Sequence, residues 1–241
     1  MKNFILFVLS IIYSSVFGQI GGLNTYKFLE LPVSSRLTAL GGAAISINDD
    51  DVNLAVANPA LLNENMDTKI AFNHNFHFAD ISNGYFAYGK YFDKWKISTH
   101  LGLGYMSYGT FKGTDEYELN TNDFKASEKY IVIGAAKKLN DRITLGVNLK
   151  PVFSTLETYN SFGLAADAGL NYNNAIKKFS LSIVVKNLGQ EISTYNDAAL
   201  KAPLDIQIGL SKKLEHLPLR FSIIAHQLQR WDVRYDDPSE Q

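Results

Sequence analysis

The stretch RITLGVNLKPVFS, residues 142–154, decides the fold because apolar and polar side chains alternate along it. Successive side chains of a β-strand point to opposite faces, so this stretch predicts a strand with two different faces. One face carries Ile143, Leu145, Val147, Leu149 and Phe153. The opposite face carries Arg142, Thr144, Gly146, Asn148, Lys150 and Ser154. The first face is therefore expected to meet lipid or a protein core, and the second to meet water.

The same alternation recurs from Thr68 onward and predicts about nine strands in all. The other strands are expected at 70–78, 85–92, 97–105, 130–137, 162–172, 179–185, 206–212 and 219–227. His74 is the one polar residue on the apolar face of the first of these strands. Alternating segments of about 10 residues are typical of transmembrane β-barrels.

The connections between these strands also favour a barrel. Short turns are expected at 93–94, 140–141, 173–174 and 215–218, and longer polar connections at 109–126, 156–161 and 188–203. Strict alternation of short and long connections is what short periplasmic turns and longer surface loops produce. Aromatic girdles are expected at the strand ends, formed by Phe92, Trp95, Tyr172 and Phe179 at one end and Tyr105, Tyr130 and Phe162 at the other. A soluble β-protein with an aromatic-rich core is the alternative.

Residues 1–18 predict a secretory signal peptide, in which Lys2 precedes an apolar run too short to span a membrane. A single membrane anchor helix is the alternative. The 241 residues contain no cysteine, so neither a disulfide framework nor a lipid-modified cysteine is expected. The net charge of -1 gives no electrostatic reason to expect nucleic acid as a partner. The expected location is the outer membrane of a Gram-negative bacterium.

The strand count predicts an unclosed barrel. An odd number of strands leaves the chain ending at the cell surface if its mature start is periplasmic, whereas closed single-chain barrels usually have an even number. Residues 231–241 are polar and contain no terminal aromatic strand. We therefore expect an all-β chain in which 68–241 form an incomplete antiparallel outer-membrane β-barrel, truncated before its last strands. If the chain is complete, either the strand count differs by one or the barrel closes with a partner.

Residues 19–67 do not alternate and are expected to form a hatch segment inside the barrel. A short helix is expected at 52–57, capped by one of the aspartates at 49–51 and stopped at Asn58-Pro59, because proline restricts the residue before it. The small residues and glycines of this segment are expected to allow close packing. Inward-facing Arg142, Lys150 and Asp167 are expected either to line a channel or to pair with the hatch.

Several motifs resemble a known family of outer-membrane barrels. The hatch motif is similar to the amino-terminal hatch of the long-chain fatty acid transporter superfamily, and it consists of Arg36, Gly41, Gly42, Asp49, Asp50, Asp51, Asn58, Pro59 and Ala60. More narrowly, the chain resembles the PorQ family of the type IX secretion system of Bacteroidetes. That likeness rests on GG at 21–22, TY at 25–26, FL at 28–29, LP at 31–32, KNLG at 186–189, LQRWD at 228–232 and YDDP at 235–238.

The resemblance covers nearly all of the chain after the signal peptide. It implies a barrel of roughly 14 strands, within the range known for such proteins. It also implies a role in the attachment complex that anchors secreted cargo to surface lipopolysaccharide. The implied partners are PorZ, with PorU and PorV as associates, together with outer-membrane lipids. Family members are longer than this chain, in agreement with the expected truncation.

The residues indicate no catalytic or metal chemistry. An EF-hand loop starting at Asp49 would need glycine and glutamate where the chain has Leu54 and Ala60. The five histidines lack metal-ligand spacing, and no Gly-x-Ser-x-Gly elbow is present. We therefore expect no enzyme and no cofactor. The leading hypothesis is an anchoring component of the secretion system, and the alternative is an outer-membrane transporter for hydrophobic small molecules with Asn58-Pro59-Ala60 as its gate.

Overall fold

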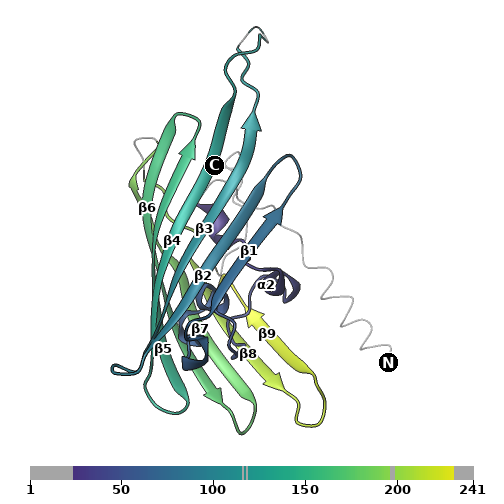
Figure 1. Cartoon of the computed structure of the whole chain (residues 1–241), viewed down its shortest axis with the longest axis vertical. Helices are drawn as coiled ribbons and strands as arrows, with labels where there is room; N and C mark the ends of the chain where they lie inside the picture. The colour runs from purple at the N-terminus through teal and green to yellow at the C-terminus, as the bar shows by residue number, and fades with distance from the viewer. Residues whose placement is uncertain (1–23, 116, 118, 196–198, 231–241) are drawn as a thin grey trace, which may run out of the picture. The chain divides into compact units, whose positions relative to one another are not determined.

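Nine antiparallel β-strands pair in chain order to form one sheet, which we call the wall (Figure 1). The computed structural model describes residues 24–115, 117, 119–195 and 199–230, so the predicted signal peptide lies outside the described residues. The strands are β1 (Ile70–Phe76), β2 (Ser82–Phe92), β3 (Ile97–Phe111), β4 (Phe124–Lys138), β5 (Ile143–Leu156), β6 (Tyr159–Asn174), β7 (Phe179–Ser193), β8 (Asp205–Lys213) and β9 (Arg220–Ala225). The all-β class, the antiparallel pairing and the number of strands confirm the prediction.

The wall is curved and open. Among the described strands, β1 pairs with β2 alone and β9 with β8 alone, so the sheet has two edges and does not close into a barrel. Figure 1 shows that the wall curls around residues 24–67, which lie on its concave side. Curvature of this kind follows from the right-handed twist that accumulates across a sheet and from β-bulges. The pairing register shifts between Ser107 and Thr110 and again between Ala166 and Ala168.

Residues 24–67, the described part of the hatch segment, contain only short helices. They are η1 (Lys27–Glu30), α2 (Ser35–Ala39), α3 (Leu54–Ala57), η2 (Pro59–Leu61) and η3 (Glu64–Met66). Helix α3 confirms the predicted helix and its end at Asn58, but the predicted aspartate cap is wrong, because Asn53 is the N-cap residue and no side chain caps the helix. The Asp51 carboxylate instead accepts from the Asn53 N–H at 3.0 Å, in the turn before the helix. The alternation pattern does not predict α2, which Ser34 caps by accepting from the Leu37 N–H at 3.2 Å. Among the described residues, no helix has both the length and the apolar character needed to cross a bilayer.

The face of the wall turned away from the hatch segment is apolar and exposed, as the alternation predicts. Its exposed side chains include Leu101, Leu103, Ile133, Leu145, Val147, Leu149, Phe153, Leu164, Leu170, Ile183, Ile208 and Leu210. The polar intrusion at His74 is satisfied within this face, because its Nδ1 lies 2.5 Å from the Tyr105 hydroxyl. Gly84 lies between these two residues in the pairing register and leaves room for the tyrosine ring. We call this the outer face.

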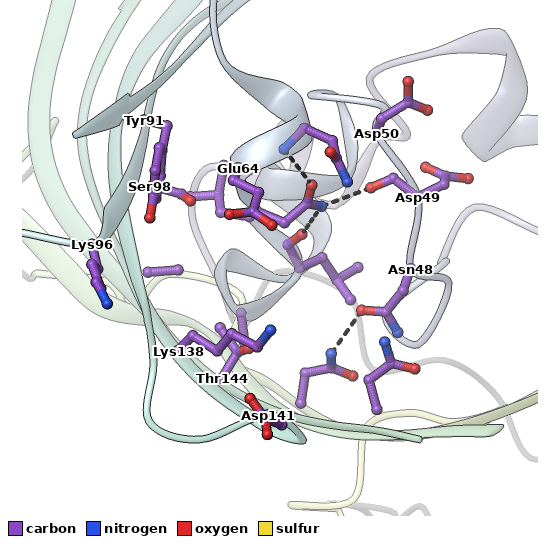
Figure 2. A pocket seen from close by; sticks show the side chains of 18 of the residues that line it. Asn48, Asp49, Asp50, Glu64, Tyr91, Lys96, Ser98, Lys138, Asp141 and Thr144 are labelled. Carbon is purple, nitrogen blue, oxygen red and sulfur yellow. Dashed lines mark hydrogen bonds between the residues drawn. The ribbon is translucent and has the colours of Figure 1, made fainter. Parts of the chain in front are cut away.

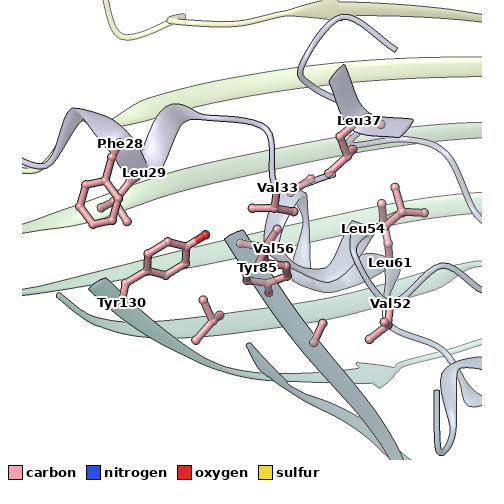
Figure 3. Close-up of a cluster of buried hydrophobic side chains, with 14 of the residues drawn as sticks. Phe28, Leu29, Val33, Leu37, Val52, Leu54, Val56, Leu61, Tyr85 and Tyr130 are labelled. Atoms are coloured by element: carbon pink, nitrogen blue, oxygen red, sulfur yellow. The ribbon is translucent and has the colours of Figure 1, made fainter. Parts of the chain in front are cut away.

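The hydrophobic core lies between the concave face and the hatch segment (Figure 3). Phe28 packs edge-on against Tyr130 with ring centroids 5.6 Å apart, and Tyr130 stacks beside Tyr85 at 6.2 Å. Glycines of β3 make room for these rings, since a Cβ at Gly104 would lie 2.1 Å from the Tyr130 ring. Tyr130 is therefore a core residue, and its predicted place in an aromatic girdle is wrong.

The connections define two ends of the wall. The turn end carries the connections 93–96, 139–142, 175–178 and 214–219, and the loop end carries 77–81, 112–123, 157–158 and 194–204. The predicted long connection at 156–161 is wrong, because Glu157 and Thr158 alone join β5 to β6. Glu157 has a φ of 57°, the left-handed geometry that two-residue hairpins favour. Strict alternation of short and long connections therefore fails at this hairpin, and the turn expected at 173–174 occurs at 175–178 instead.

We expect Val147→Arg to destabilise the protein by about 2–4 kcal/mol in a bilayer, because a charge at this mid-strand position would face lipid. On a sheet that faces water, the same change at a residue 58% exposed would alter stability by no more than about 0.5 kcal/mol. Urea unfolding of protein reconstituted in lipid vesicles measures the effect, with Val147→Leu as the apolar control. Equal stability of the two variants would show that this face does not meet lipid.

Candidate functional site

Ion pairs hold the acidic part of the hatch motif. The guanidinium of Arg36 contacts Asp49 and lies 2.8 Å from the Asp51 carboxylate. Asp50 pairs instead with Lys69, the residue before β1. These contacts, which we call the hatch clasp, join α2 and the acidic stretch to the start of the wall. The hydrogen bond to Asp49 raises the pKa of Arg36, and the bond from Lys69 lowers the pKa of Asp50.

Gly41 and Gly42 form the turn after α2, where their φ angles are 87° and 83°. Such left-handed angles favour glycine. A Cβ at either position would meet no atom within 4 Å, so these two residues shape the turn and do not bring surfaces together. The close-packing role predicted for the glycines of the hatch segment is therefore wrong at both positions.

The Asn58-Pro59-Ala60 element presses against glycines of the wall. A Cβ at Gly146 would lie 2.3 Å from the Pro59 carbonyl carbon, and a Cβ at Gly169 would lie 2.1 Å from Asn58 Oδ1. Asn58 is fully buried, accepts from the Ala60 N–H at 2.9 Å and donates to a hatch carbonyl at 2.7 Å. Hatch and wall therefore fit most closely at this element, and its amide groups stay satisfied there.

A buried ion pair links the wall to α3. Lys150 Nζ lies 2.7 Å from the Asp167 carboxylate, and the two side chains are 1% and 0% exposed. The Asn187 backbone N–H donates to Asp167 at 2.9 Å, and its side-chain carbonyl accepts from Lys150 at 3.0 Å. Asn148 donates at 3.0 Å both to Asp167 and to the Ala55 carbonyl of α3. Lys150 and Asp167 thus pair with each other and reach the hatch through Asn148.

Further hydrogen bonds join the hatch segment to the strands that follow. Asn171 of β6 donates to the Asn48 side chain at 2.7 Å, and Asn48 donates to Ser180 of β7 at 2.7 Å. Ser211 of β8 donates to the Ser46 carbonyl at 2.6 Å. Alternation predicts that these wall residues face inward, but it does not predict their partners. Hydrogen bonds to β5, β6, β7 and β8 therefore secure the hatch.

An open cavity of about 1070 Å³ lies at the turn end, between the hatch segment and the wall (Figure 2). Hatch residues on its lining include Asn48, Asp49, Asp50, Ala60 and Glu64, and wall residues include Lys96, Lys138, Asp141 and Arg142. Sequence reasoning missed this cavity because its walls come from turns far apart in the chain. Its lining carries charges of both signs, and Arg142 borders it without pairing with Asp167.

The hairpin of β3 and β4 projects beyond its neighbours at the loop end (Figure 1). The rings of Phe111 and Phe124 stack across it with centroids 5.2 Å apart. Near its tip, the Asp115 carboxylate accepts from the N–H groups of Tyr117 and Leu119, both at 2.9 Å. Tyr117 is 75% exposed and Leu119 is 64% exposed. The described residues near the tip thus present apolar side chains to the surroundings, which is a common property of protein-binding surfaces.

In the described part of the chain, no group of three or more histidine, cysteine, aspartate or glutamate residues is placed to hold a metal ion. The carboxylates of the acidic stretch instead form the ion pairs of the hatch clasp and accept from nearby backbone N–H groups, as seen for Asp49, Asp50 and Asp51. What the hatch and wall offer chemically is binding: a polar cavity at one end and an apolar hairpin tip at the other.

Lys150→Met should destabilise the protein by about 3–5 kcal/mol, because it leaves Asp167 buried without its cation. The double variant Lys150→Met, Asp167→Leu should recover most of this loss, since it removes both buried charges. Equilibrium unfolding in detergent micelles measures both free energies. A double variant no more stable than the single one would show that the orphaned charge is not the cause.

Acidification should weaken the hatch clasp. Because Lys69 lowers the folded-state pKa of Asp50, the stability that Asp50 contributes is present above its unfolded pKa of about 4. That contribution is lost as the pH falls through the lower folded value. Proteolysis of the hatch segment, followed from about pH 7 to pH 3, should therefore accelerate less steeply in Asp50→Asn than in the parent chain. Parallel pH profiles would contradict this role of Asp50.

No protein-family model matches the chain, and no curated protein matches its sequence. The resemblance to the PorQ family therefore stays a prediction from short motifs, and the function has to be argued from the wall, the hatch and their surfaces.

Proposed function

We propose that the chain forms the wall and hatch of an outer-membrane β-barrel in the type IX secretion attachment complex, where it anchors partner proteins and supports attachment of cargo to the cell surface. The observation that carries this proposal is the inverted polarity of the wall. Large apolar side chains are exposed on its outer face, while amides and the charged pair Lys150–Asp167 are buried on its concave face. Soluble proteins rarely expose contiguous apolar surface on this scale, and lipid would cover it.

The lengths of the strands support a wall that crosses a bilayer. Strands β3 to β7 have 14 to 16 residues, more than the ~9–11 residues that a tilted transmembrane strand needs. Strands satisfy their backbone groups through their neighbours, which is a requirement for crossing lipid. The excess length carries the strands beyond the membrane, where hairpins reach partner proteins.

The hatch favours an anchoring role over transport. Asn58 and Pro59 lie against Gly146 and Gly169, and a buried ion pair secures α3 through Asn148. In a transporter for hydrophobic small molecules, the Asn58-Pro59-Ala60 element would have to leave these glycines to open a path. Its removal would expose the buried amides of the concave face, which is unfavourable unless water replaces every bond. We therefore keep the transporter as the weaker candidate.

Partner docking at the cell surface is assigned to the β3–β4 hairpin. The longest connections, 112–123 and 194–204, lie at the loop end, whereas the turn end has connections of similar, shorter length. Because periplasmic turns are short and surface loops are longer, this difference places the loop end outside the cell. The projecting tip then offers Tyr117 and Leu119 to a surface partner, for which the family resemblance suggests PorZ. Exposed aromatic and aliphatic anchors of this kind carry much of the binding energy in protein interfaces. The mixed-charge cavity at the turn end would face the periplasm.

Replacing Tyr117 and Leu119 with serine should reduce capture of PorZ about 30-fold or more, which corresponds to the loss of about 2 kcal/mol at an interface anchor. The measurement is co-purification of PorZ from detergent-extracted outer membranes of a deletion strain that carries each variant. Tyr159→Ser, at the neighbouring β5–β6 hairpin and 55% exposed, is the matched control.

The deletion strain itself tests the wider proposal. Cargo should be released into the medium in that strain and should return to the cell surface when the parent gene is restored. Cargo that stays attached normally without the gene would refute the anchoring role. Undiminished PorZ capture by the tip variant would refute the assignment of the hairpin alone.

A further inference from the structure

A row of buried oxygen groups crosses the concave face at the loop end, opposite to the cavity of Figure 2. It contains two carboxylates, Glu128 of β4 and Glu191 of β7, which are 7% and 2% exposed. Inward-facing serines lie between them, because Glu128 stands opposite Ser154 and Ser154 stands opposite Ser161 in the pairing register. The row therefore extends across four neighbouring strands. We call it the acidic row.

Hydroxyl groups surround both carboxylates. The Tyr108 hydroxyl donates to Glu128 at 2.5 Å. Ser161 donates to Glu191 at 3.2 Å, and the Tyr26 hydroxyl lies 2.5 Å from Ser161. Because Ser161 donates its only proton to Glu191, the Tyr26 hydroxyl is the donor in its hydrogen bond with Ser161. Burial raises the pKa of Tyr26 to about 12, so this hydroxyl is neutral. These donors are neutral, and they orient the carboxylates without compensating their charge.

No cationic side chain compensates this charge in the described part of the chain, where the six ion pairs involve neither Glu128 nor Glu191. The contrast is with Asp167, which is equally buried and has Lys150 beside it. Burying an ionised carboxylate is strongly unfavourable unless it is paired or coordinates a metal. Without a cation a carboxyl at such a site would hold a proton, so the acidic row is a place where a cation from solution could supply the positive charge that these residues do not.

Ser154 provides an independent observation. Its side chain is 2% exposed, and within the described residues its Oγ atom makes no hydrogen bond. The same hydroxyl lies close to Glu128 and to Tyr195, which borders the row from the connection after β7. Buried hydroxyls nearly always have a partner, so an oxygen without one beside the Glu128 carboxylate is a candidate ligand for an electropositive centre.

We propose that the acidic row binds a hard divalent cation of the calcium class, with Glu128 and Ser154 as ligands and Glu191 as the second compensating charge. Calcium takes six to eight oxygen ligands in flexible geometry, and every polar side chain of the row offers oxygen. Softer metals would require nitrogen or sulfur donors. The two carboxylates balance the charge of a divalent ion. This site does not depend on the proposed secretion role.

Bound calcium would also join the hatch to the loop end of the wall. Thr25, at the start of the described hatch segment, donates to Glu191 at 3.0 Å, and its neighbour Tyr26 contacts Ser161. The backbone N–H of Leu200, in the connection between β7 and β8, donates to the other Glu191 oxygen at 3.0 Å. An ion held by the acidic row would therefore stabilise the first described hatch residues together with Leu200.

Calorimetric titration of calcium chloride into the chelator-treated full chain in detergent micelles tests the proposal. The parent protein should bind one ion per chain with a saturable heat. Glu128→Gln keeps the side-chain shape and the Tyr108 hydrogen bond, and it should weaken calcium binding about tenfold or more, since even outer-shell partners of metal sites contribute this much. Glu157→Gln, an exposed glutamate at the same end, should bind calcium as the parent does.

Ser154→Ala separates a ligand from a structural residue. Its hydroxyl has no partner among the described residues, so its removal should leave unfolding in chelator unchanged while the affinity for calcium falls. This variant also keeps the test valid if Glu128→Gln fails to fold. Absence of saturable calcium binding by the parent chain, or unchanged affinity in Ser154→Ala and Glu128→Gln, overturns the proposal. Calcium binding and PorZ capture are separate measurements, so either proposal can fail while the other holds.

Discussion

The contact between the concave face and the hatch segment is the interaction on which the rest of the structure depends. The hatch helices contain three to five residues each, too few for a helix to be stable in isolation. The concave face in turn combines glycines and buried amides with apolar side chains such as Tyr85 and Tyr130, which form a core only together with the hatch. Each part therefore supplies what the other lacks: the hatch gives apolar side chains such as Phe28, and the wall gives hydrogen-bond partners such as Asn148.

This mutual dependence explains why the polarity of the wall is inverted. A soluble sheet covers its apolar face with a second layer, so polar residues remain outside. Here the covered face carries Lys150, Asp167 and Asn171, and the uncovered face carries Val147 and Leu149. The hatch forms hydrogen bonds with the polar side chains of the concave face. Each of these directional bonds holds one hatch residue in place. The outer face consists of apolar side chains that form no directional bonds, so an apolar solvent such as lipid would cover it without a specific partner.

The alternation seen along 142–154, which recurs from Thr68 onward, was enough to predict the strands, their faces and their number, because a period of two indicates a β-strand in segments of that length. The prediction failed where a polar or aromatic residue is compatible with more than one structural position. The polar residues around Glu157 were expected to form a loop, yet they belong to a hairpin whose strands extend past the apolar zone. Tyr130 alternates onto the concave face, although its residue type suggested a girdle. The cavity, the pairing of Arg36 with Asp49 and Asp51, and the acidic row depend on contacts between distant segments, which no local pattern records.

The two buried acidic sites show how charge is distributed along the concave face. Midway along the wall, Lys150 neutralises the charge of Asp167. Asn148 donates to both Asp167 and the Ala55 carbonyl, so this ion pair also helps to fix the position of α3. At the loop end, Glu128 and Glu191 have only neutral donors, so that region is completed by a cation from solution. Because β4 continues from Glu128 into the projecting hairpin, an ion bound there would restrain the hairpin base. A restrained base lowers the conformational entropy lost when the tip docks, which strengthens binding without any new contact to the partner.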